Sequence, residues 1–191
     1  MRTIGACGIF WIVGLLGFAE TATAQIVLGL DVVRAGEPSE VAVHSGLSSY
    51  RHLGVVEYSK LSDKDNGSGC SLGARYEFTP RKVYDQTADR IRRVSAFAVA
   101  SIAYVDDSCT STPSDEDTPP AGLGRYFNAR ADMGGGVRIR LFEVPGAFGG
   151  LLRVAVTSRH FFGTKGNPGR TGLGVSVGLD MLTTVFLGKG D

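Results

Sequence analysis

The chain has 191 residues, of which 43% are hydrophobic and 20% charged, and its formal net charge at pH 7 is +1. This balance argues against nucleic acid as a partner, because binding to phosphates requires a clear excess of basic residues. After residue 25 there is no apolar run of about 18 residues, which excludes a membrane-spanning helix there but leaves open the shorter strands of a membrane β-barrel.

The first 24 residues are expected to be a cleaved secretory signal peptide. Arg2 supplies the positive start, residues 4–18 are almost wholly apolar, and Ala22-Thr23-Ala24 provides the small residues that signal peptidase accepts. The apolar run is about 15 residues long, short of the roughly 20 that a membrane-spanning anchor needs. Cleavage after Ala24 leaves residues 25–191 as one domain, exported to an oxidising compartment.

The rest of the chain is dominated by alternation between apolar and polar residues, the pattern of a β-strand with two different faces. Four segments show it clearly, at residues 70–79, 126–142, 151–157 and 171–181. Four weaker segments lie at residues 25–34, 40–47, 53–61 and 94–105. Taken alone, residues 94–105 are also compatible with a buried helix, but their place in the series favours a strand. We therefore predict an all-β protein, an eight-stranded antiparallel up-and-down β-barrel.

The segment 126–142 sorts its side chains onto two faces. One face is apolar or small and consists of Phe127, Ala129, Ala131, Met133, Val137, Ile139 and Leu141. The other face is polar and consists of Asn128, Arg130, Asp132, Arg138 and Arg140. Gly134-Gly135-Gly136 lies between them without disturbing the alternation, and indicates a bulge or tight bend in a curved strand. A phosphate-binding loop is disfavoured, because it needs a following helix and a lysine.

The connections between the segments differ in character on the two sides of the predicted barrel. The first, third, fifth and seventh are polar and rich in turn-forming residues, at 35–39, 62–69, 106–124 and 163–170. The second and sixth are short. The fourth, residues 80–93, departs from this pattern, and a helical turn is expected around 83–91. Short turns on one side and long polar loops on the other are typical of an outer-membrane barrel with both chain ends in the periplasm.

Alternation alone does not say which face of the barrel meets water. A soluble periplasmic barrel of the lipocalin kind turns its apolar face inward and binds an apolar ligand in the lumen, whereas a membrane barrel turns its charges inward. The length of the segment 126–142, the aromatic residues near strand ends and the absence of charge from the apolar faces favour the transmembrane barrel. Its lumen is then lined by a network of paired charges: Asp31, Arg75, Glu77, Arg130, Asp132, Arg138, Arg140, Arg153 and Asp180. Eight strands leave an interior that side chains can fill, so no wide pore is expected.

Three runs of residues resemble the small outer-membrane β-barrel domains of the OmpA/OmpX-like, porin-family class. They are residues 72–80 (LGARYEFTP), 134–141 (GGGVRIRL) and 172–179 (GLGVSVGL). The resemblance implies an integral protein of the bacterial outer membrane, surrounded by its lipid, delivered by the barrel-insertion machinery and monomeric. It further implies a structural, adhesive or host-contact role without catalytic residues or cofactors. Such barrels usually end on an aromatic residue, and here that signal is absent or displaced to Phe186.

Candidate sites in the sequence are few. Cys70 and Cys109 fall at the same end of the predicted barrel and are candidates for a disulfide worth about 3 kcal/mol. His160 followed by residues 167–169 (NPG) weakly resembles the site of outer-membrane lipid A hydrolases, but Phe162 stands where the serine nucleophile is required. No histidine or cysteine cluster has the spacing of metal ligands. The sequence therefore predicts a protein that is not an enzyme.

Overall fold

The computed structural model of the chain describes residues 23–34, 38–49, 51–64, 67–80, 84–85, 90–107, 122–144 and 147–186. Residues 1–22 of the predicted signal peptide and Cys109 lie outside these ranges, so the predicted cleavage and the predicted Cys70–Cys109 bridge stay predictions. Thr23 and Ala24 are the first residues of the first strand.

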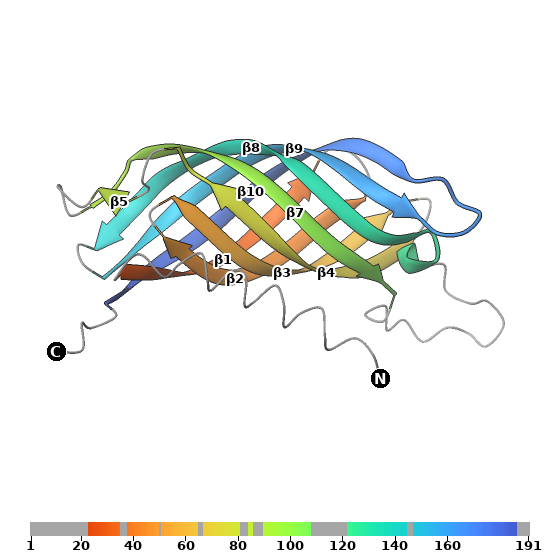
Figure 1. Cartoon of the computed structure of the whole chain (residues 1–191), viewed down its shortest axis with the longest axis horizontal. Coiled ribbons are helices and arrows are strands. Elements are labelled where there is room, and N and C mark those ends of the chain that lie inside the picture. Colours follow the sequence, from red (N-terminus) through yellow and green to blue (C-terminus); the bar gives the residue numbers. More distant parts are fainter. Residues whose placement is uncertain are drawn as a thin grey trace.

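Eight strands close into one antiparallel barrel in the order β1-β10-β9-β8-β7-β4-β3-β2 (Figure 1). Their bounds are β1 Thr23–Arg34, β2 Ser39–Ser49, β3 His52–Asp63, β4 Gly67–Phe78, β7 Val94–Asp106, β8 Phe127–Val144, β9 Phe148–Gly163 and β10 Arg170–Phe186. Consecutive barrel strands are neighbours throughout, and β1 pairs with β10 at the seam. The predicted up-and-down eight-stranded barrel is confirmed, including the strand at residues 94–105 that could have been a helix.

The two ends of the barrel differ, as the loop lengths predicted. We call the end at which Thr23 pairs with Phe186 the turn end, because the connections β2–β3 and β8–β9 there are short. The opposite end, the loop end, carries the long connection between β7 and β8 (residues 107–126) and the one between β9 and β10 (164–169), together with the shorter β1–β2 and β3–β4 connections. The connection between β4 and β7 is the exception, a long one at the turn end. At the loop end a short 3-10 helix, η1 (Leu123–Arg125), precedes β8.

The connection from β4 to β7 corrects one expectation. Instead of a helical turn around residues 83–91, the described part forms a small two-stranded sheet of β5 (Tyr84–Asp85) and β6 (Arg90–Ile91). Ile91 then enters the turn end of the barrel and is buried. Nothing described in this structure is a helix long and apolar enough to cross a membrane.

Strand β8 has two irregularities of register, between Phe127 and Ala129 and between Arg140 and Phe142. The first reverses the expected direction of Phe127, which lies inside the barrel with 5% of its surface exposed, while Asn128 is exposed. Pairing runs on without a shift through residues 134–136, so the glycines are not a bulge. A Cβ at Gly134 or Gly136 would lie 2.1 Å from a carbonyl oxygen of β9, and these two glycines therefore allow β8 and β9 to approach closely.

Candidate functional site

The barrel interior is built by the inward-facing residue of every second position, because side chains alternate across a strand. Eight of the nine predicted lumen charges lie there, each at most 8% exposed: Asp31, Arg75, Glu77, Arg130, Asp132, Arg138, Arg153 and Asp180. Arg140 keeps the inward register, paired with Leu151 of β9, but lies at the rim of the turn end and is part-exposed. There it pairs with Glu143 and donates a 2.7 Å hydrogen bond to the carbonyl of Ile91.

Four further buried, ionisable residues contact these eight charges: Glu40, His44, Glu57 and Arg159. The sequence contained a signal for them, since each lies at an inward position of its strand's alternation. Glu57, for example, follows Leu53 and Val55 at every second residue and separates Val56 from Tyr58, both exposed. The segments that contain Glu40, His44 and Glu57 show only a weak alternation of apolar and polar residues, so these three were not recognised as interior residues. We call these four residues and the eight above, without Arg140, the charged layer.

Arg130 organises the half of the charged layer nearer the loop end. Its guanidinium donates to Glu40 at 2.6 Å and to Glu57 at 2.9 Å, and its Nε lies 3.0 Å from Asp132. Arg159 also pairs with Glu40 and lies 3.4 Å from Asp132. Each of these carboxylates therefore contacts a guanidinium, which is the condition for keeping charges out of water.

Arg75, Arg138 and Arg153 organise the other half of the charged layer. Arg75 donates to Asp31 at 2.8 Å, and its Nε lies 2.9 Å from Glu77. Arg153 bridges the same two carboxylates, donating to Glu77 at 2.6 Å and pairing with Asp31. Arg138 pairs with Glu77, and its guanidinium lies 4.4 Å from the ring centroid of Phe97, a cation–π contact inside the lumen.

Glu57 joins the two halves. One carboxylate oxygen accepts from Arg130, and the other accepts from Arg75 at 2.6 Å. The strands that supply these residues, β3, β4 and β8, are thereby cross-linked through the lumen as well as around the wall. The charged layer is one connected network.

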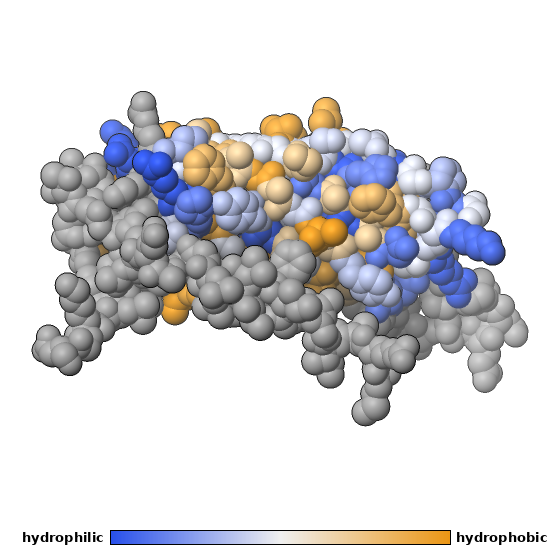
Figure 2. Space-filling model, viewed as in Figure 1, coloured by the Kyte–Doolittle hydropathy of each residue, from blue (hydrophilic) through white to orange (hydrophobic). Residues whose placement is uncertain are grey.

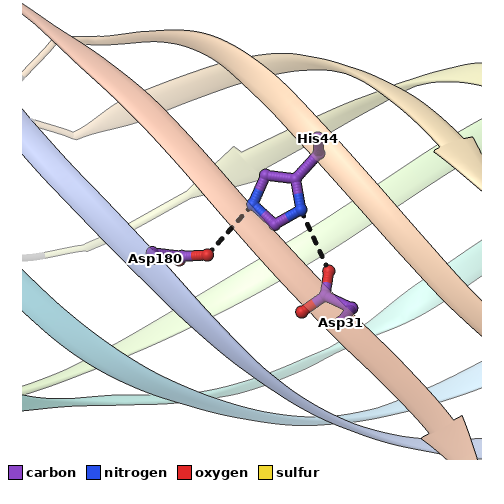
Figure 3. A group of neighbouring side chains, drawn as sticks. All are labelled: Asp31, His44 and Asp180. Atoms are coloured by element: carbon purple, nitrogen blue, oxygen red, sulfur yellow. Dashed lines mark hydrogen bonds and ion pairs between the residues drawn. The ribbon is translucent and has the colours of Figure 1, made fainter.

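His44 lies at the barrel seam, between two aspartates (Figure 3). Its Nε2 is 3.0 Å from Asp180 on β10, and its Nδ1 is 3.2 Å from Asp31 on β1. Gly29 on β1 pairs with both His44 and Asp180, and a Cβ there would lie 2.1 Å from Nε2 of His44. The cluster exists because position 29 carries no side chain.

Two aspartates and a histidine are also a possible set of metal ligands. Here the imidazole ring stands between the carboxylates and turns a different nitrogen to each, as Figure 3 shows. One ion cannot bind both nitrogens of one ring, and Asp31 is already paired with two arginines. The geometry is that of ion pairs rather than of a metal centre.

Apolar clusters close the charged layer at both ends. At the turn end the cluster consists of Val27, Leu53, Val55, Ile91, Leu151 and Leu182. At the loop end it consists of Leu61, Val105, Leu123, Phe127 and Phe161. Between them the structure contains a cavity of about 40 Å³, lined by residues including Glu57, Arg75, Arg130 and Arg153. Such a space holds a few waters, which can hydrate guanidinium nitrogens that lie near carboxylates without forming a hydrogen bond.

The outer wall is the inverse of the interior. Along β10 the outward residues Leu173, Val175, Val177, Leu179 and Met181 are all exposed. Exposed aromatic residues lie toward the turn end at Tyr76, Phe78, Phe142 and Phe148, and toward the loop end at Tyr58, Tyr104 and Phe162. Apolar side chains spread over the visible wall in Figure 2, and most of the strongly hydrophilic ones lie toward its ends.

His160 and Cys70 lie near the loop end. His160 Nδ1 is 2.7 Å from the hydroxyl oxygen of Thr171 on β10, and its ring packs edge-on against Phe162 at 4.6 Å. The histidine thus has a hydroxyl neighbour that sequence reasoning missed, because it comes from the next strand. Cys70 is buried and disulfide-bonded, and Cys109, its predicted partner, lies outside the described residues.

No family model matches the chain, and no curated protein sequence is significantly similar to it. Among solved structures, the chain is similar to the N-terminal β-barrel domain of Pseudomonas aeruginosa OprF, at 10% identity and a TM-score of 0.49 over 86% of this chain and 98% of that one. It is also similar to Neisserial surface protein A, at 12% identity and a TM-score of 0.39 over 86% of this chain and 96% of that one. A de novo designed transmembrane β-barrel matches at 8% identity and a TM-score of 0.40, over 87% of this chain and 98% of that one. At these values the function has to be inferred from the residues of this chain.

Proposed function

We propose that this chain is an integral β-barrel protein of the bacterial outer membrane, without enzymatic activity and without a wide pore. Its role is structural, adhesive or surface-interacting, with the longer loops presented outside the cell and the turn end, where Thr23 pairs with Phe186, in the periplasm. The lipid of the outer membrane and the barrel-insertion machinery are its partners, and it acts as a monomer.

The observation that carries this proposal is the inverted sorting of side chains. Among the described residues, 28 large hydrophobic side chains are exposed, while 20 polar or charged residues are buried. A soluble protein rarely exposes a contiguous apolar surface of more than a few hundred Å². A wall of this kind is stable where hydrocarbon, rather than water, surrounds it.

The dimensions agree with a bilayer. Strand β7 has 13 residues. At a rise of about 3.4 Å per residue and a tilt of about 40°, it extends about 34 Å along the barrel axis, enough to cross a hydrocarbon core of about 30 Å. Of the seven exposed aromatic residues, six lie within two residues of the end of their strand and Tyr58 lies in the middle of β3. Strand ends are where the membrane interface favours such side chains.

The soluble barrel with an apolar ligand receives no support from the geometry. The Leu and Val faces that would have to line its lumen point outward, and the described interior contains ion pairs and a cavity with room for a few waters. The same filling argues against a wide pore, because the charged layer and the two apolar clusters occupy the lumen in succession.

The lipid A hydrolase remains disfavoured for a chemical reason. Phe162 occupies the position that the serine nucleophile needs, and the hydroxyl beside His160 belongs to Thr171. A general base needs a third group that orients it for catalysis. Among the described residues, no carboxylate forms an ion pair with His160.

Membrane fractionation tests the proposal. We expect the protein in the outer-membrane fraction, resistant to extraction with carbonate, and migrating faster on a gel when it is not boiled. Recovery in the soluble periplasmic fraction, without a shift in mobility on boiling, would contradict it.

A further inference from the structure

His44 is the one ionisable side chain of the charged layer whose contacts depend on an added proton. Both of its ring nitrogens face carboxylate oxygens, at 3.0 Å and 3.2 Å, and its side chain is fully buried. The Nε2 contact is a hydrogen bond, whereas Nδ1 lies close to Asp31 without hydrogen-bond geometry. In a neutral imidazole one nitrogen carries a lone pair, which a neighbouring carboxylate repels, so only the imidazolium is attracted by both aspartates.

The charges of the layer lead to the same conclusion. Its carboxylates are Asp31, Glu40, Glu57, Glu77, Asp132 and Asp180. Its guanidinium groups are Arg75, Arg130, Arg138, Arg153 and Arg159. With a neutral His44 the six carboxylates exceed the five guanidinium groups, and an unbalanced charge in a closed interior is costly. Protonated, His44 is the sixth cation.

The carboxylate that lacks a close arginine partner is a direct neighbour of His44. Asp31 pairs with both Arg75 and Arg153. Asp180 has a more distant arginine partner, because the guanidinium of Arg138 lies 3.7 Å from its carboxylate. Glu77, the other carboxylate near this group, is shared among the same three arginines. Asp180 is therefore the carboxylate with the weakest arginine contact, and His44 contacts it at 3.0 Å.

We propose that the barrel binds one proton inside the charged layer, held on His44 between Asp31 and Asp180. The resulting imidazolium balances the charge of the layer. It also joins β2, β1 and β10 across the seam at which the barrel closes. This proposal concerns the interior and holds whatever surrounds the outer wall, so its failure is separable from that of membrane residence.

Nitrogen NMR of the folded barrel tests the proposal directly. The protein, labelled with ¹⁵N at histidine and held in detergent micelles, is studied at about pH 7.5, where an ordinary histidine is mostly neutral. We expect both ring nitrogens of His44 to give the signals of protonated nitrogen, assigned by their loss in His44→Gln. A signal from one unprotonated ring nitrogen would overturn the proposal.

The variant Asp180→Asn separates charge balance from burial. With one carboxylate removed, five carboxylates face five guanidinium groups, and His44 should change to the spectrum of a neutral ring. Ser62→Arg at the loop end is the control and should leave the His44 signals unchanged. An imidazolium that persists in Asp180→Asn would refute the role in charge balance. A stoichiometric metal ion in the purified protein, lost in His44→Gln, would refute proton binding at this site.

Discussion

Replacing Arg130 by methionine tests whether the charged layer contributes to stability as a network. The guanidinium is 1% exposed and contacts three carboxylates, those of Glu40, Glu57 and Asp132. Methionine fills much of the space but leaves the carboxylates with fewer cations. Breaking a buried pair by removing one partner costs about 3–5 kcal/mol. Because the adjoining cavity of about 40 Å³ lets water reach these groups, we expect a loss near the lower limit, about 3 kcal/mol.

Equilibrium unfolding in urea, with the barrel in lipid vesicles, measures this loss. The only tryptophan of the chain is Trp11, within the predicted signal peptide, so circular dichroism and the gel shift on boiling are better probes than tryptophan fluorescence. Arg170→Met is the matched control. Arg170 pairs with Asp63 at 3.2 Å, and its side chain is 43% exposed although that of Asp63 is buried. Water reaches this guanidinium, so we expect a smaller loss than for Arg130, about 1 kcal/mol.

A double variant completes the experiment. It combines Arg130→Met with Glu40→Gln and so removes one cation and one anion together. Because fewer carboxylates are left without a cation, we expect the double variant to recover part of the stability that Arg130→Met loses. Equal stability of Arg130→Met and Arg170→Met would refute the reasoning, because it would mean that the interior is hydrated well enough for its ion pairs to act like surface pairs.

Four further results are expected. Gly29→Ala puts a Cβ 2.1 Å from His44 and should destabilise the barrel by about 1–3 kcal/mol in the same unfolding assay, whereas Gly172→Ala, which has nothing within 4 Å, should have little effect. Val177→Arg, on the outer wall near the middle of β10, should cost about 2–4 kcal/mol in vesicles and Ser62→Arg at the loop end about 0–1 kcal/mol; equal effects would argue against a wall facing hydrocarbon. In planar bilayers the purified protein should give no steady conductance, and a stable ohmic channel would show that the layer and its two apolar clusters do not seal the lumen. Mass spectrometry of unreduced peptides should find Cys70 joined to Cys109, and Cys109→Ser should leave a free thiol at Cys70; a bond from Cys70 to any other cysteine would contradict the predicted pairing.

The sequence by itself determined the fold class and most of the sorting of side chains. A strand places successive side chains on opposite faces, so the confinement of charge to alternate positions of the segment 126–142 identifies one inward face before any contact is known. The composition of residues 94–105 fits both a helix and a strand, and their place in the series of alternating segments correctly indicated a strand. Prediction failed at Phe127, because an irregular register changes the direction of a side chain without changing the residue types, and at residues 83–91, where a short two-stranded sheet replaces the expected helical turn.

Tertiary structure decided which charges meet. Arg130 and Glu40 are 90 positions apart, and Arg153 and Asp31 are 122 apart, so no local pattern relates them. His44 and Asp180 come together because closure of the barrel places β2, β1 and β10 side by side, with Gly29 between them. The sequence showed that charges line the interior. Their pairing, and the proton that His44 requires, depend on the stagger of strands in the closed barrel, a long-range property that alternation does not encode.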